Sequence, residues 1–304
     1  MQDIGIITPV RNEEQNLPKL IESVINQTIK PTSWAIIDDN STDASPEIIS
    51  NYASQYEWIS KLENGGSESY EMRANYSEVL KVGYKFLIDK FGDDIDYYLI
   101  LDGDMEISSN YVEGLAKFLN QSQEIVIASG GIYLETENGL KLEKRSKIHP
   151  AGGATLYDGD FYRSIGGPPV IPGVDAATEI KARTRGFECR YLSSKDIKAI
   201  QSRPTGSKGS TWNNMYNRGY NSYVLGTTPS TMLIRSVWMC KNSPHYRGLP
   251  ALIGYLRSML SATERTQDKE ILRYQKKDKK KEMVKNFKNI VNSWVNSSNQ
   301  QKKR

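Results

Sequence analysis

Cysteine is almost absent from this 304-residue chain, which contains only Cys189 and Cys240. Two cysteines outside any CxxC pair cannot build a disulfide framework, and they do not indicate a zinc site. Long apolar runs are also missing. The most apolar candidate, residues 223–240, is interrupted by the polar segment 227–230 and contains Arg235. A membrane-spanning helix needs about 20 predominantly apolar residues, so we expect none.

The N-terminus lacks a basic leader and a cleavage site, and it passes directly into the apolar segment Ile4-Gly5-Ile6-Ile7. These features favour a cytoplasmic protein. The residues that follow this segment, Thr8 to Glu13, contain no glycine. A dinucleotide-dependent oxidoreductase would carry GxGxxG there, and a sugar nucleotidyltransferase would carry a glycine-rich loop for a triphosphate.

The composition is that of a globular protein, with 38% hydrophobic and 25% charged residues. A chain of this length can bury a sizeable core. The net charge is +4, and it is concentrated at the C-terminus, where residues 273–304 contain eleven Lys or Arg against Asp278 and Glu282.

Apolar patterning predicts alternating strands and helices in the first hundred residues. The expected strands are residues 4–10, 34–37 and 97–101, and the expected helices are residues 16–26, 46–52 and 72–91. Further strands are predicted at 125–129 and 132–135, and a further helix at 176–185. This order indicates an α/β fold with a mostly parallel sheet. We expect a domain boundary near Ser243-Pro244, with a helical extension over residues 244–304.

Polar clusters follow each of the first three predicted strands, at the sheet edge where α/β proteins bind ligands. Asp102-Gly103-Asp104 follows the third strand. A turn at Gly103 would bring two carboxylates together as ligands for a hard divalent cation, and a solvated turn is the alternative. Asp38 and Asp39 follow the second strand. They could accept hydrogen bonds from a nucleobase or ribose, or form an Asx-type turn before a helix capped by Ser41, Thr42 or Asp43.

Three segments in this order resemble the opening of family 2 glycosyltransferases of the GT-A fold. They are Thr8-Pro9-Val10-Arg11-Asn12-Glu13-Glu14, Ile36-Ile37-Asp38-Asp39-Asn40-Ser41-Thr42-Asp43 and Leu99-Ile100-Leu101-Asp102-Gly103-Asp104. The resemblance extends over roughly residues 1–240. It implies one GT-A domain over residues 1–243, with a nucleotide-binding half at about 1–105 and an acceptor half at about 106–243.

The resemblance also implies a role for individual side chains on the donor side. Pro9, Arg11 and Glu13 would line the nucleotide base, although the family more often has Tyr at the position of Arg11. Asp38 or Asp39 would hold the base edge and ribose, and Asp102 and Gly103 would lie near the ribose. Asp102 and Asp104 would bind Mg²⁺ or Mn²⁺. Arg73 would lie near the nucleotide, and a surface arginine is the alternative.

Residues 173–187 resemble the acceptor-side segment of the family, in which a Glu-Asp pair precedes a helix. Asp175 matches the Asp of that pair and Val174 replaces the Glu, so Asp175 is the candidate catalytic base. The alternative is an N-cap role for Asp175, with Glu179 as the i,i+4 partner of Arg183. Lys208, Trp212 and Arg218 resemble a later segment that contacts the diphosphate or acceptor.

Together these roles imply an inverting transfer of a sugar from a UDP- or GDP-linked donor to a hydroxyl of a glycan or lipid-linked acceptor. The rival interpretations are a sugar nucleotidyltransferase and a non-catalytic sugar- or nucleotide-binding protein. No nucleic-acid partner is expected, because no stacking or groove-reading module accompanies the basic tail.

The tail contains an apolar stripe within residues 283–295, set among lysines. Such a helix suits peripheral contact with an anionic membrane, with Leu249 to Leu260 as a second interfacial element. Packing on the catalytic domain or on a second protomer is the alternative.

Overall fold

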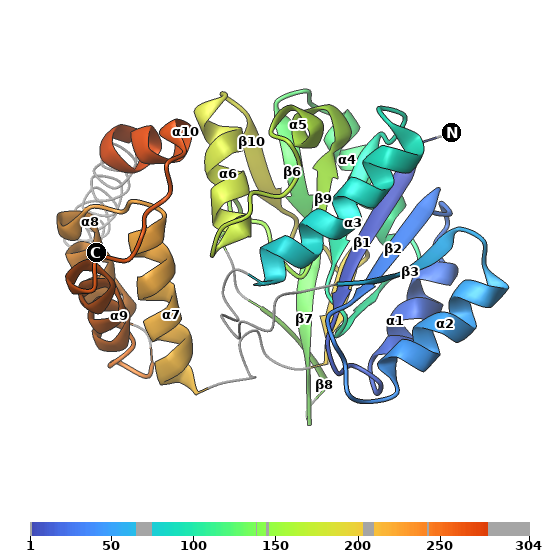
Figure 1. The fold of residues 1–304 in the computed structure, drawn as a ribbon, viewed down its shortest axis with the longest axis horizontal. Coiled ribbons are helices and arrows are strands. Elements are labelled where there is room, and N and C mark those ends of the chain that lie inside the picture. Colours follow the sequence, from blue (N-terminus) through green and yellow to red (C-terminus); the bar gives the residue numbers. More distant parts are fainter. Residues whose placement is uncertain are drawn as a thin grey trace, which may run out of the picture. The chain divides into compact units, whose positions relative to one another are not determined.

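The computed structural model describes residues 2–64, 75–137, 139–143, 146–202, 210–241 and 243–278. The chain forms two compact units, Met1–Ser207 and Lys208–Arg304. The first unit is an α/β sandwich and the second is helical (Figure 1). The predicted fold class, α/β with a mostly parallel central sheet and a helical C-terminal region, is confirmed.

A seven-stranded sheet in the order β10-β6-β9-β4-β1-β2-β3 forms the centre of the first unit. The strands are β1 (Ile4–Val10), β2 (Ser33–Asp38), β3 (Ile59–Glu63), β4 (Tyr97–Leu101), β6 (Ile125–Ser129), β9 (Ala154–Asp158) and β10 (Glu188–Tyr191). β1 runs parallel to both β2 and β4, while β9 is antiparallel to both β4 and β6.

Alternate side chains of the central strands enter two separate cores, because successive residues of a strand point to opposite faces. Ile4, Ile6 and Leu99 pack with α1 (Leu17–Ile25), α2 (Ser45–Gln55) and α4 (Tyr111–Asn120). Ile7, Ile37 and Ile100 pack with α3 (Asn75–Phe91), α5 (Gly159–Ser164) and α6 (Val174–Thr184). The second group of helices covers the face of the sheet that Figure 1 presents. Both faces are therefore covered, which explains why the strands are almost wholly apolar.

A smaller sheet in the order β5-β11-β7-β8 adjoins the end of β4. Its strands are β5 (Met105–Ile107), β7 (Gly131–Thr136), β8 (Gly139–Leu142) and β11 (Lys198–Gln201). The pairing of β5 with β11 brings Gln201 opposite Met105, next to the Asp102-Gly103-Asp104 turn.

The second unit contains α7 (Thr211–Val224), α8 (Pro229–Met239), α9 (Gly248–Leu260) and α10 (Lys269–Arg273), followed by a π-helical turn, Tyr274–Asp278. Its core contains Met215, Tyr223, Met232, Ala251 and Tyr255, which come from α7, α8 and α9. Because these three helices share one core, the division between units falls at residues 207/208 rather than near the sequence boundary at Ser243-Pro244. Among the described helices, none is long and apolar enough to cross a bilayer.

Replacing Gly219 with Ala should destabilise the second unit, because an added Cβ would lie 1.9 Å from the backbone oxygen of Ala251 in α9. Overpacking of this kind costs about 1–3 kcal/mol, and backbone atoms cannot move aside as side chains do. Denaturant unfolding followed by circular dichroism measures the loss. The exposed α7 residue Asn213, replaced by Ala, serves as the control and should change stability by less than about 0.5 kcal/mol. An unchanged midpoint for Gly219→Ala would contradict this packing.

Candidate active site

The loops that follow β1, β2 and β4 lie at one edge of the large sheet, as the parallel order predicts. In the β1–β2 register Val10 lies opposite Asp38, and in the β1–β4 register Ile7 lies opposite Ile100. The backbone N–H of Asp39 donates to the Val10 carbonyl at 2.8 Å, which continues the β1–β2 pairing to the end of the strands. The three polar clusters are therefore brought together.

The loops after β1 and β2 are joined by reciprocal hydrogen bonds. The Asn12 N–H donates to Ser41 Oγ at 3.0 Å, and the Thr42 N–H donates to Asn12 Oδ1 at 2.7 Å. The Glu13 N–H donates to Ser45 Oγ at 2.9 Å. Asn12 has a φ of 55°, in the left-handed region that asparagine tolerates better than most residues. These contacts fix the positions of Arg11 and Glu13 relative to Asp38 and Asp39.

Asp39 is held by two neighbours, whereas Asp38 closes a turn. Asn64 Nδ2 donates to Asp39 Oδ1 at 2.8 Å, and the Arg11 guanidinium lies 3.6 Å from Asp39 Oδ2. The Ser41 N–H lies 3.4 Å from each carboxylate oxygen of Asp38, in the expected Asx-type turn. The N-cap of the following helix α2 is Ala44, not Ser41, Thr42 or Asp43.

Asp102-Gly103-Asp104 forms a turn between β4 and β5. The Asp102 N–H donates to the Gly153 carbonyl at 2.9 Å, and the Met105 N–H donates to the Asp102 carbonyl at 3.2 Å. Gly103 is buried, and a Cβ there would lie 3.1 Å from Glu13 Cγ. Glycine at this position therefore lets the β4 turn pack directly on the β1 loop.

Two glycines between Asp102 and Asp175 allow these carboxylates to approach a common segment of backbone. A Cβ on Gly152 would lie 2.2 Å from Asp175 Oδ2, and a Cβ on Gly153 would lie 3.1 Å from Asp102 Oδ2. The N-cap of α6 is Gly173, with a φ of 81°, and Asp175 is the second residue of the helix. The alternative that Asp175 is the helix N-cap is therefore wrong.

The electrostatic environment of Asp102 reflects this convergence of acidic groups. Burial raises the pKa of Asp102 to about 7; a hydrogen bond from Tyr76 lowers it, and the charges of Asp104, Asp175 and Glu13 raise it. Asp104 is itself held through its backbone, where its carbonyl accepts from the Ser202 N–H at 3.2 Å. A nearby cation would favour the charged form of Asp102.

Tyr76 of α3 is a site residue that the sequence pattern did not single out. Its hydroxyl donates to Asp102 Oδ1 at 2.7 Å. Burial raises the pKa of Tyr76 well above its ordinary value, and the charges of Asp102 and Asp175 add to this effect. Tyr76 therefore keeps its proton and orients the Asp102 carboxylate. The only sign of this role in the sequence is a polar hydroxyl, that of Tyr76, among the apolar residues on the buried face of α3.

The remaining predicted residues belong to other elements of the chain or lie outside the described residues. Glu179 pairs with Arg183 at 2.9 Å, as predicted, and also contacts His149 Nδ1 at 2.8 Å. Arg73 and Lys208 lie outside the described residues. Trp212 and Arg218 are exposed residues of α7 in the second unit, where the Trp212 ring lies 6.3 Å from that of Tyr246.

The donor set at Asp102 and Asp104 suits a hard divalent cation that takes its other ligands from a substrate. Within the described part of the chain, no group of three or more His, Cys, Asp or Glu side chains is arranged to hold a metal by itself. Mg²⁺ is typically bound by one or two carboxylates together with substrate phosphates and water. The two carboxylates therefore fit a cation that binds with a phosphate ligand.

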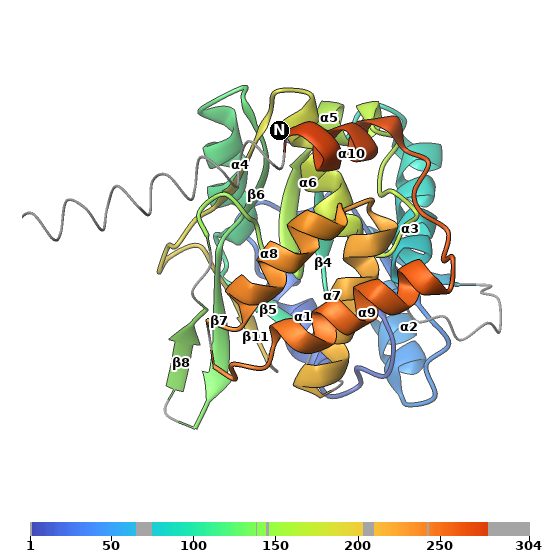
Figure 2. The ribbon, with the colours of Figure 1, turned by 90° about the vertical axis from the view of Figure 1, so that its left-hand side faces the viewer.

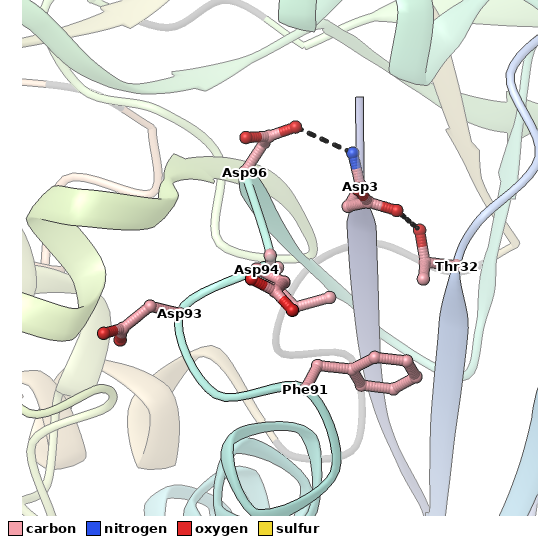
Figure 3. Close-up of a pocket in the computed structure, with 7 residues that line it drawn as sticks. Asp3, Thr32, Phe91, Asp93, Asp94 and Asp96 are labelled. Carbon is pink, nitrogen blue, oxygen red and sulfur yellow. Dashed lines mark hydrogen bonds between the residues drawn. The ribbon is translucent and has the colours of Figure 1, made fainter. Parts of the chain in front are cut away.

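An acidic hollow lies elsewhere, where β1 and β4 begin rather than where they end (Figure 3). The Asp3 N–H donates to Asp96 Oδ2 at 2.8 Å, and Thr32 Oγ1 donates to Asp3 Oδ1 at 2.8 Å. These bonds join the chain segments at the start of the strands, so this hollow is not part of the candidate active site.

Comparison with known proteins finds similarity to glycosyltransferases, the class that the sequence motifs resemble. Residues 5–77 match the family model described as glycosyl transferase family 2. The chain is 32% identical over 152 residues to minor teichoic acid biosynthesis protein GgaA of Bacillus subtilis, covering 46% of this chain and 30% of that protein. It is 30% identical over 126 residues to poly(ribitol-phosphate) beta-glucosyltransferase of Bacillus spizizenii, covering 40% of this chain and 17% of that protein. The matches thus span less than a third of the length of these relatives.

Solved structures share the fold at low sequence identity. The S. aureus TarS 1–349 structure superposes with a TM-score of 0.53 at 14% identity, covering 86% of this chain and 73% of TarS 1–349. The mannosyltransferase PcManGT from Pyrobaculum calidifontis superposes with a TM-score of 0.54 at 12% identity, covering 85% and 74%. The predicted resemblance to family 2 glycosyltransferases is confirmed over residues 5–77, and the solved structures share the GT-A-type fold.

Without divalent cations, Asp102 should make the folded protein less stable as the pH rises from 3.8, its ordinary pKa, to about 7, its pKa in the fold. In this window the folded protein keeps a proton that the unfolded chain has released, so the free energy of unfolding falls with pH. Asp102→Asn removes this dependence. The stability of the wild type relative to the variant should fall by up to about 1.4 kcal/mol per pH unit. Denaturant unfolding of both proteins with EDTA measures it, and a pH-independent difference would rule out the raised pKa.

Proposed function

We propose that the protein is an inverting glycosyltransferase that moves a sugar from a nucleoside diphosphate sugar to a hydroxyl of a glycan or lipid-linked acceptor. The observation that carries this proposal is the convergence of Asp102, Asp104 and Asp175 at the carboxyl edge of the sheet, beside the joined loops after β1 and β2. Ligands of open α/β sheets bind at this edge.

The loops after β1 and β2 would hold the nucleotide. Asp38 and Asp39 are both 8% exposed, and their carboxylates can accept from a base edge and ribose hydroxyls. Pro9 lies near the end of β1, and Arg11 and Glu13 lie in the loop that follows it. UDP and GDP are the donor classes we infer, since TarS has been solved with UDP and PcManGT with GDP-Man and Mn²⁺.

Asp104 and Asp102 would hold Mg²⁺ or Mn²⁺ against the diphosphate. When bound, the ion would neutralise the charge that develops on the leaving diphosphate. Tyr76 would keep one oxygen of Asp102 engaged, so that the other oxygen remains available to the ligand. The raised pKa of Asp102 means that cation binding must compete with a proton near neutral pH.

Asp175 would act as the general base. Its carboxylate would take the proton of the acceptor hydroxyl as that oxygen attacks the anomeric carbon, and the bond from this carbon to the diphosphate oxygen would break. Attack on the face opposite the leaving group inverts the anomeric centre. Gly152 offers no side chain against Asp175 Oδ2, so the carboxylate can lie directly on the backbone there.

The names of two relatives support an inference about the class of acceptor. One relative takes part in minor teichoic acid biosynthesis and another is a poly(ribitol-phosphate) glucosyltransferase. We therefore infer that the acceptor is a hydroxyl-rich glycopolymer or its lipid-linked form. A cytoplasmic location remains a prediction. Membrane contact through the basic tail also remains a prediction, because residues 279–304 lie outside the described part of the chain.

Asp175→Asn should keep donor binding and lose transfer. Donor binding is measured by thermal stabilisation with UDP- or GDP-sugars plus Mn²⁺, because a bound ligand raises the melting temperature. Transfer is measured with a poly(polyol-phosphate) acceptor, and loss of a general base should lower its rate by about 10²–10⁴-fold. The exposed α3 residue Asp89, replaced by Asn, is the matched control and should leave both measurements unchanged. Normal transfer by Asp175→Asn would remove Asp175 from the mechanism.

Asp104→Asn, unlike Asp175→Asn, should weaken donor binding. The variant should lose the Mn²⁺-dependent part of the stabilisation by a nucleoside diphosphate, because one of two metal-binding carboxylates is gone. Folding should be preserved, since the Asp104 backbone carbonyl keeps its bond from the Ser202 N–H. If Mn²⁺ stabilised the variant–nucleotide complex as much as the wild type, the metal assignment would be wrong.

A further inference from the structure

Two helices of the second unit expose an apolar surface that the catalytic proposal does not use. On α8, Leu233, Ile234, Val237 and Trp238 are 55%, 48%, 67% and 47% exposed. Their spacing of i, i+1, i+4 and i+5 places them on one side of the helix. On α9, Leu249, Ile253, Leu256 and Leu260 are 51%, 38%, 39% and 82% exposed, at i, i+4, i+7 and i+11. We call these eight residues the α8/α9 face.

The α8/α9 face cannot turn inward, because the opposite sides of both helices are locked by close packing. A Cβ on Gly254 would lie 2.2 Å from the Tyr216 carbonyl oxygen in α7, and a Cβ on Gly248 would lie 1.9 Å from that of Ser236 in α8. Met232, Ala251 and Tyr255 fill the core that both helices share with α7. Figures 1 and 2 show α8 and α9 on the same side of α7. The exposed apolar residues of both helices therefore lie on the sides that face away from this shared core.

The charged side chains of α7, α8 and α9 all have one sign. The sequence contains no Asp or Glu between Asp196 and Glu264, a stretch that includes all of α7, α8 and α9. Lys241 and Arg257 are exposed at the C-terminal ends of α8 and α9, and Arg247 precedes α9. Lys241 Nζ lies 5.6 Å from the centre of the Trp238 ring, at the border of the apolar residues. The surface thus combines apolar side chains with a cationic rim.

We propose that the α8/α9 face docks on the surface of an anionic lipid bilayer. Apolar side chains in such a surface enter the boundary between headgroups and acyl chains, while basic residues remain at the phosphates. Tryptophan suits this boundary because its ring is apolar and its N–H is polar. The absence of acidic residues from positions 197–263 favours a phospholipid surface over a second copy of the chain, since two copies of the cationic rim would repel each other.

Vesicle flotation of the full chain tests the proposal. The wild type should float with vesicles of phosphatidylcholine and phosphatidylglycerol, float much less with phosphatidylcholine alone, and be released by high salt. Val237→Glu/Leu260→Glu should lower partitioning by about tenfold or more, because two apolar contacts become two anionic side chains. Leu140→Glu, which alters a 45% exposed leucine on β8, is the matched control and should float like the wild type.

Circular dichroism and light scattering accompany the flotation. If the double Glu variant unfolds, Val237→Ser/Leu260→Ser replaces it and should also lose partitioning. The proposal that the α8/α9 face binds the bilayer is supported if the wild type floats with phosphatidylglycerol-containing vesicles and both double variants do not. The proposal is overturned if the wild type does not float, if the folded double variants float as well as the wild type, or if the wild type is a dimer that these variants dissociate.

Discussion

The candidate site depends on one constraint, the parallel pairing of β1 with β2 on one side and β4 on the other. All three strands are buried on both faces, so a slip of one residue would exchange the side chains of the two cores. The fixed register places the Asp38-Asp39 loop, the Arg11–Glu13 loop and the Asp102-Gly103-Asp104 turn at one edge. Buried Gly103 then lets the turn after β4 pack directly on the loop after β1. The geometry of the site is therefore a consequence of the core.

The fold tolerates acidic groups that oppose one another at this edge. Burial raises the pKa of Asp102 to about 7, and the charges of Asp104 and Asp175 contribute to the shift. Burial and repulsion at Asp102 would be relieved by a cation, which favours the charged carboxylate. Perturbed carboxylates of this kind are concentrated at functional sites. An arrangement that is unfavourable for the isolated protein is thus suited to a ligand that brings positive charge.

Local pattern was sufficient to predict β1, β2, β4 and β6, because each is a short apolar run bounded by polar or turn residues. It was also sufficient to predict α1 and α6 within two residues. The strand β9 was missed, since Ala154–Asp158 pairs antiparallel with strands that lie far from it in sequence. That strand and the preceding Gly152-Gly153 bring Asp175 toward Asp102. The sequence pattern therefore identified both aspartates as candidates, but it did not predict that they lie close together. The hydrogen bond from Tyr76 and the early start of the second unit likewise depend on tertiary packing.

The most direct test of a shared metal and diphosphate site is the thermodynamic coupling between Mn²⁺ and UDP or GDP. Free Mn²⁺ is measured by electron paramagnetic resonance during titration with and without the nucleotide. If both ligands meet at Asp102 and Asp104, each should tighten the binding of the other by the same factor, about tenfold or more, because linkage is reciprocal. An Mn²⁺ affinity that is unchanged by either nucleotide would contradict the central claim.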